Sequence, residues 1–217
     1  MIRVEPRPEP EDFDANVRLP GHDALRELRG EPRLRTRPGP RRTQRDVIRA
    51  GDLPAYWTEC LEDLHEAYGG ICAYSCFHIE SATRDWTVDH YLPKGSEPLE
   101  NAYEWSNYRL ASRVMNSHKH QFTDVLDPFT VKDGWFEINF FSFEVHAAEG
   151  VPDAVRIQVN ASINRLTLNE RSMRQLRKRY FDAYQSGDIS LRYLEQYAPF
   201  VAREMVRQGK ATRRGSN

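Results

Sequence analysis

The chain has 217 residues and a formal net charge of −1, and its 29% of charged residues against 39% hydrophobic ones is typical of a soluble globular protein. This length suits one domain of ordinary size, or a domain with extensions. No apolar run approaches the roughly 20 residues that a membrane-spanning helix needs, and residues 1–14 lack the pattern of a secretory signal. Three cysteines are too few for a disulfide framework, so the sequence predicts a cytoplasmic protein.

Composition and periodicity predict an α+β fold in three segments. Residues 1–42 read as a flexible, basic N-terminal arm, because they are rich in Pro and Arg. Residues 43–122 are predicted to carry a helical lead and a central unit of two strands and a helix, and residues 123–217 strands and helices that pack on it. The expected elements are a helix over 43–68 broken near Pro54, strands over 86–90 and 107–111, a helix over 112–122, strands within 134–145 and 154–159, and helices within 168–187 and 189–209.

Arginine dominates the basic residues of this chain. Of 31 basic residues only five are Lys, and nine Arg against two Glu and one Asp lie between Leu25 and Arg49. Arg binds two phosphate oxygens at once, so the stretch is a candidate phosphate contact. A GC-rich genome and a solvated arm without a partner explain the same composition.

The central segment "TVDHYLPKGSEPLENAYEWSNYRLASRVMNSHKH" places polar residues at the ends of its predicted elements. Asp89 and His90 close the first strand, and Asn107 opens the second strand seventeen residues later. Asn116, Lys119 and His120 have the i, i+3, i+4 spacing of one helical face. Because strand neighbours point to opposite sides, Asp89 and His90 can face one point only if the strand ends or distorts there.

The blocks "VDHYLPK", "WSNYRL" and "MNSHK" together resemble the HNH endonuclease motif, a ββα-metal finger, over residues 70–122. The resemblance implies that Asp89 and Asn116 hold a divalent cation, that His90 is the general base, and that Asn107 orients the loop. Mg²⁺ is the expected cofactor. His120 would add a nitrogen ligand that suits Mn²⁺, Ni²⁺ or Zn²⁺, or else contact phosphate or lie exposed. The expected nucleic-acid contacts are Lys119, Arg113 and Lys94.

The cysteines depart from the HNH pattern. Many HNH proteins hold a structural zinc with two CxxC pairs, whereas Cys72 and Cys76 are spaced CxxxC here. Ser112 and Met115 stand where the second pair is expected, and neither binds zinc. We therefore expect no structural zinc, and Cys72 and Cys76 as buried apolar residues.

The sequence thus predicts a metal-dependent endonuclease that acts on DNA. The alternatives are a non-catalytic nucleic-acid or protein-binding module on the same scaffold, and an RNase. The order of the motifs also resembles bacterial HNH proteins of phage-defence systems with retrons or Septu-type ATPases, which implies a partner ATPase or another defence subunit. Taken singly, an Asp-His pair is usually a surface turn, and an Asn early in a helix is usually a cap.

Overall fold

The computed structural model describes residues 1–34 and 41–212 and has a mixed α+β fold. In these residues seven α-helices accompany two antiparallel sheets of two strands each. The helices are α1 (Leu19–Leu28), α2 (Leu61–Ala67), α3 (Arg113–Lys119), α4 (Asp153–Arg165), α5 (Arg171–Gln185), α6 (Leu191–Tyr197) and α7 (Pro199–Arg207). The strands are β1 (Trp86–His90), β2 (Tyr108–Ser112), β3 (Phe136–Ile138) and β4 (Val145–Ala147).

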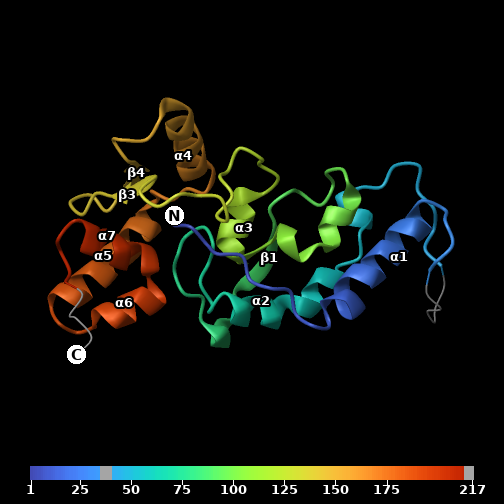
Figure 1. Ribbon diagram of the computed structural model, residues 1–217, viewed down its shortest axis with the longest axis horizontal. Coiled ribbons are helices and arrows are strands. Elements are labelled where there is room, and N and C mark those ends of the chain that lie inside the picture. The colour runs from blue at the N-terminus through green and yellow to red at the C-terminus, as the bar shows by residue number, and fades with distance from the viewer. Residues whose placement is uncertain (35–40, 213–217) are drawn as a thin grey trace.

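Strands β1 and β2 form an antiparallel hairpin that leads directly into α3. Its register is regular from Trp86↔Ser112 to His90↔Tyr108. The hydroxyl of Ser112 accepts a hydrogen bond from the Met115 backbone at 3.3 Å and so caps the start of α3. Figure 1 shows β1, α2 and α3 in the middle of the molecule, with α1 toward one end and α4–α7 toward the other.

The N-terminal segment is packed against the hairpin, so the expectation of a flexible arm is wrong for its described part. A π-helix over Asp14–Arg18 continues into α1. Phe13 lies edge-on to Trp105 and Tyr108, with ring centroids 5.6 and 5.8 Å apart. Gly21 sits on the ring of Tyr103, where a Cβ would come within 2.1 Å of a ring carbon. Apolar side chains among the Pro and acidic residues therefore order this segment.

The Arg-rich stretch is mostly ion-paired where the structure describes it. Arg29 pairs with Glu100 at 2.6 Å, and Arg45 with Asp52 at 3.4 Å. Arg33 pairs with buried Glu27. Residues 35–40 of this stretch and residues 213–217 of the basic C-terminus lie outside the described residues.

Two further elements differ from the sequence expectation. Instead of a helix over 43–68, the chain forms 3-10 helices at Ala50–Asp52 and Tyr56–Cys60 and only then α2, because Gly51 and Pro54 interrupt the helix. The predicted strand at 154–159 is part of α4. The residues Val159, Ser162, Ile163 and Leu166 are buried on one side of that helix or at its end, and their spacing of three to four residues outweighs the short alternation.

One cluster of buried side chains includes residues from all three predicted segments. It extends from Met1 through Tyr74, Leu110 and Ile138 to Met205. The boundaries at residues 42 and 122 therefore stay predictions, since no gap in the core marks them. No helix within the described residues is both long and apolar enough to span a membrane.

Candidate functional site at the β1–β2 hairpin

Asn107 fastens both ends of the loop that joins the two strands. Its side-chain oxygen accepts a hydrogen bond from the Leu92 backbone at 2.8 Å. Its amide nitrogen donates to the carbonyls of Leu92 at 3.0 Å and Asn101 at 2.9 Å. The side chain is 6% exposed, so three hydrogen bonds hold a buried amide in place. These are contacts of the kind that the sequence resemblance implies for this residue.

His90 is buried on one face of the hairpin and held in one tautomer. Its Nε2 lies 3.0 Å from the carbonyl oxygen of Ala102. A carbonyl only accepts, so Nε2 carries the proton and Nδ1 keeps its lone pair. The ring lies edge-on to Trp57 at 4.8 Å and to Tyr108 at 5.1 Å. Burial lowers the pKa of His90 to about 3, so the imidazole is neutral at physiological pH.

Asp89 is buried on the other face and has partners for both carboxylate oxygens. Oδ2 accepts a hydrogen bond from the hydroxyl of Tyr74, and Oδ1 lies 3.4 Å from the ammonium of Lys119. Its exposed fraction is 2%. Burial raises the pKa of Asp89, while the charge of Lys119 and the Tyr74 hydrogen bond oppose this rise.

The Asp89–His90 pair lies at the end of β1, which is one of the two expected arrangements, but the two side chains do not face one point. The strand does not distort at these residues, because His90 still pairs with Tyr108. Asp89 therefore contacts Tyr74 and Lys119, whereas His90 contacts Trp57 and Ala102 on the opposite face. The structure brings the side chains of Asp89 and Lys119 together and places the imidazole of His90 on the opposite face, while Asn116 contacts the Val88 carbonyl.

Helix α3 supplies Asn116 and Lys119. The amide of Asn116 donates to the Val88 carbonyl at 3.4 Å. Lys119 has no exposed surface, and its ammonium donates to the carbonyls of His90 and Tyr91, both at 3.0 Å. The expected phosphate contact by Lys119 is therefore wrong for this structure, because the ammonium is buried and binds two carbonyls and the Asp89 carboxylate within the protein.

The other expected contacts differ in position. His120 follows the end of α3 with a positive φ of 47°, and its exposed ring lies near Phe122 at 6.3 Å. Arg113 is exposed and lies 3.8 Å from Asp85. The ammonium of Lys94 lies 4.4 Å from the ring centroid of Trp57, and burial lowers its pKa. Lys94 thus shares Trp57 with His90.

Three side chains of this region were missed by the sequence reasoning. Tyr74 binds Asp89, Trp57 packs on His90, and Arg109 forms a two-point ion pair with Asp127 at 2.7 and 2.8 Å. Tyr74 and Trp57 lie outside the HNH-like blocks and look like ordinary core aromatics. The sequence offers no signal that singles them out.

The donor set does not fit a divalent cation as it stands. Mg²⁺ binds carboxylate oxygens at about 2.1 Å, but the ammonium of Lys119 already neutralises Asp89 from 3.4 Å. Within the described ranges no group of three or more His, Cys, Asp or Glu side chains could hold a metal. Cys60, Cys72 and Cys76 are free and buried. No protein-family model and no curated protein matches the chain.

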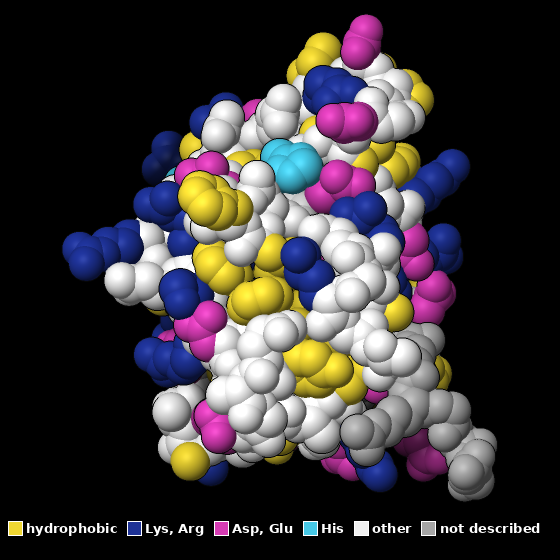
Figure 2. Space-filling model, turned by 90° about the vertical axis from the view of Figure 1, so that its left-hand side faces the viewer, with side chains coloured by type: hydrophobic (Ala, Val, Ile, Leu, Met, Phe, Trp, Pro, Cys, Tyr) yellow, Lys and Arg dark blue, Asp and Glu magenta, His cyan; other side chains and the backbone are white. Residues whose placement is uncertain are grey.

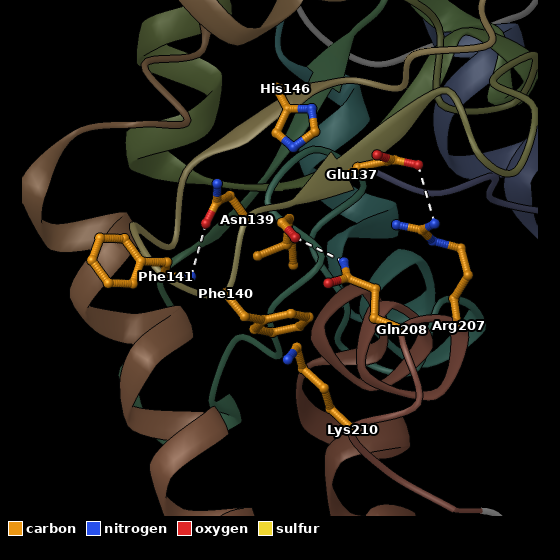
Figure 3. A pocket seen from close by; sticks show the side chains of 9 residues that line it. Glu137, Asn139, Phe140, Phe141, His146, Arg207, Gln208 and Lys210 are labelled. Atoms are coloured by element: carbon orange, nitrogen blue, oxygen red, sulfur yellow. Dashed lines mark hydrogen bonds and ion pairs between the residues drawn. The ribbon is translucent and has the colours of Figure 1, made fainter.

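A separate hollow of about 610 Å³ lies beside the β3–β4 hairpin and the end of α7. Figure 3 shows His146, Phe140 and Lys210 around it, with Arg207 paired to Glu137 at 3.1 Å. On this face of the molecule, hydrophobic side chains are interspersed with charged side chains of both signs (Figure 2). The hollow contains none of the expected site residues, and its mixed charge does not favour a polyanion.

Proposed function

We propose that this chain is an HNH-type endonuclease that hydrolyses phosphodiester bonds in DNA. The observation that carries the proposal is the fixed tautomer of His90, whose Nε2 donates to Ala102 and whose Nδ1 keeps its lone pair. A base so oriented, at the end of β1 and beside the loop fastened by Asn107, agrees with the roles that the sequence resemblance implies.

In the proposed reaction, a water attacks the phosphorus and gives a proton to Nδ1 of His90, while the bond from phosphorus to the 3′ oxygen breaks. The 3′ oxygen leaves and takes up a proton from solvent, so the products are a 5′ phosphate and a 3′ hydroxyl. An imidazole with a pKa of about 3 is a weak base. A phosphodiester beside it carries a negative charge, which stabilises the imidazolium and raises this pKa toward the working pH. Lys94 lies on the same side, close enough for its charge to lower the pKa of His90, and it is the proposed phosphate contact there.

A divalent cation would neutralise charge on the phosphate when bound. Mg²⁺ is proposed first, with Mn²⁺ or Ni²⁺ next, and Asp89 and Asn116 are the side chains that the resemblance assigns to it. The Asp89–Lys119 pair opposes this assignment. A partner ATPase or another subunit of an antiviral defence system stays a prediction of the sequence.

Nicking of supercoiled plasmid tests the proposal. Wild type should cut with at least one of Mg²⁺, Mn²⁺ and Ni²⁺, and not in EDTA. The change His90→Ala should lower the rate about 100-fold or more. His146→Ala is the matched control, since His146 is an exposed histidine on β4, and it should cut like wild type. Equal cutting by His90→Ala and wild type would remove His90 as the base. A parallel single-stranded RNA substrate separates an RNase from a DNase.

The Asp89–Lys119 pair also favours a second candidate, a non-catalytic nucleic-acid or protein-binding module on the same scaffold. In such a module, a carboxylate neutralised within the protein serves the fold rather than a metal. DNA binding in a mobility-shift assay without cutting under any of the metal conditions would support this candidate over the nuclease.

A further inference from the structure

Oxygen atoms of the protein surround the buried ammonium of Lys119. An ammonium has three donor hydrogens, and three oxygens surround this one: the carbonyls of His90 and Tyr91 at 3.0 Å and Oδ1 of Asp89 at 3.4 Å. The side chain has no exposed surface. A buried charge with an ion-pair partner and two hydrogen bonds is stabilised in its position.

The same three oxygens are the kind that a hard cation seeks. Mg²⁺ and Mn²⁺ prefer carboxylate, carbonyl and amide oxygens. The amide of Asn116 contacts the Val88 carbonyl, one residue before Asp89 on β1. A metal ion on Oδ1 of Asp89 would lie within a few ångströms of the Lys119 ammonium, and two cations at that distance repel in a buried site.

We propose that Lys119 is the resident cation of the Asp89 site and excludes divalent metal from it while no nucleic acid is bound. Removal of the Lys119 charge should therefore create a metal site at Asp89. The inference rests on the proposed function for the expectation that Asp89 binds metal once DNA is present. In this proposal, the charge of Lys119 excludes the metal, and a lack of oxygen ligands does not.

A titration of Mn²⁺ into the full chain tests the proposal. Binding is measured as the loss of the free Mn²⁺ signal in electron paramagnetic resonance. Lys119→Gln keeps a hydrogen-bond donor for the two carbonyls and removes the charge. It should bind Mn²⁺ at least about tenfold more tightly than wild type. Adding Asp89→Asn to Lys119→Gln should abolish the gain. Lys178→Gln makes the same charge change at an exposed position of α5 and should leave Mn²⁺ binding as in wild type.

Three results would overturn the proposal: micromolar Mn²⁺ binding by wild type at Asp89, no gain in Lys119→Gln, or a gain that survives Asp89→Asn. Circular dichroism checks the fold, and Lys119→Met replaces Lys119→Gln if the latter does not fold. If neither variant folds, Mn²⁺ is titrated into wild type and Asp89→Asn. Micromolar Mn²⁺ binding by wild type that Asp89→Asn removes overturns the proposal, and no micromolar Mn²⁺ binding by wild type supports it. Plasmid nicking is measured separately, so failure of the nuclease proposal shows as absent cutting whatever the Mn²⁺ titration gives.

Discussion

The Asp89–Lys119 pair predicts a large and coupled loss of stability. Each partner is buried, with exposed fractions of 2% and 0%. Replacing one leaves the other charge buried without its partner, which costs about 3–5 kcal/mol. For a chain of this length that corresponds to a fall in melting temperature of about 6–20 °C. Lys119→Met also frees the carbonyls of His90 and Tyr91, so it should be the more damaging single change.

Urea unfolding of wild type, Asp89→Asn, Lys119→Met and the double variant at pH 7 measures the coupling. The double variant should lose at least about 1 kcal/mol less than the two single losses added together. Lys178→Met is the control, because its pair with Asp182 is exposed and should contribute under about 1 kcal/mol. The reasoning is refuted if Asp89→Asn is neutral or stabilising, which is the behaviour of a carboxylate whose only partner is a metal ion.

Three further predictions follow from neighbouring groups. Asn107→Ala removes three buried hydrogen bonds and should lower the free energy of unfolding in urea by about 2–4 kcal/mol. A loss under about 1 kcal/mol would mean that Asn107 does not hold the loop. The pKa of His90 falls from 6.5 to about 3 on folding, so the unfolded chain takes up the proton first and stability drops as pH falls from 6.5 toward 3. The free energy of unfolding of His90→Gln should fall about 2 kcal/mol less between pH 7 and pH 5 than that of wild type. If NMR shows the His90 ring of native wild type taking up a proton between pH 7 and pH 5, the prediction is wrong. Burial raises the pKa of Cys60 to about 12, so native protein at pH 8 should not react with a thiol reagent at this residue until urea unfolds it.

The hairpin and its helix could be predicted because their signals are local. The residues of β1 alternate between the two sides of the hairpin, Ser112 supplies a helix cap, and the three polar blocks have a fixed order. The contacts of Asn107 with the loop backbone depend only on residues within fifteen positions of it. For such features the sequence carries most of the information.

The features that sequence reasoning missed depend on distant partners. Phe13 is ordered by Trp105, which lies ninety-two positions away, so a segment rich in Pro and acidic residues is packed rather than flexible. The short alternation near Val159 agrees with a strand, but the core that it contacts selects a helix. Lys119 has the spacing of a phosphate contact, and only the position of the Asp89 carboxylate shows that its charge is used internally.

The opposite directions of Asp89 and His90 restrict where a phosphate could meet both. A ligand on one face of the two-stranded hairpin does not reach the other face, so the place from which a phosphate could approach both residues is the end of β1, where the strand gives way to Tyr91. There the carbonyls of His90 and Tyr91 are both held by Lys119. Movement of the Lys119 ammonium would therefore free the Asp89 carboxylate and the backbone next to His90 in a single event. The contacts of the Lys119 ammonium with Asp89 and with the His90 and Tyr91 carbonyls thus couple the two parts of the proposed site, the Asp89 carboxylate and the His90 imidazole. Loss of these contacts should alter both parts together.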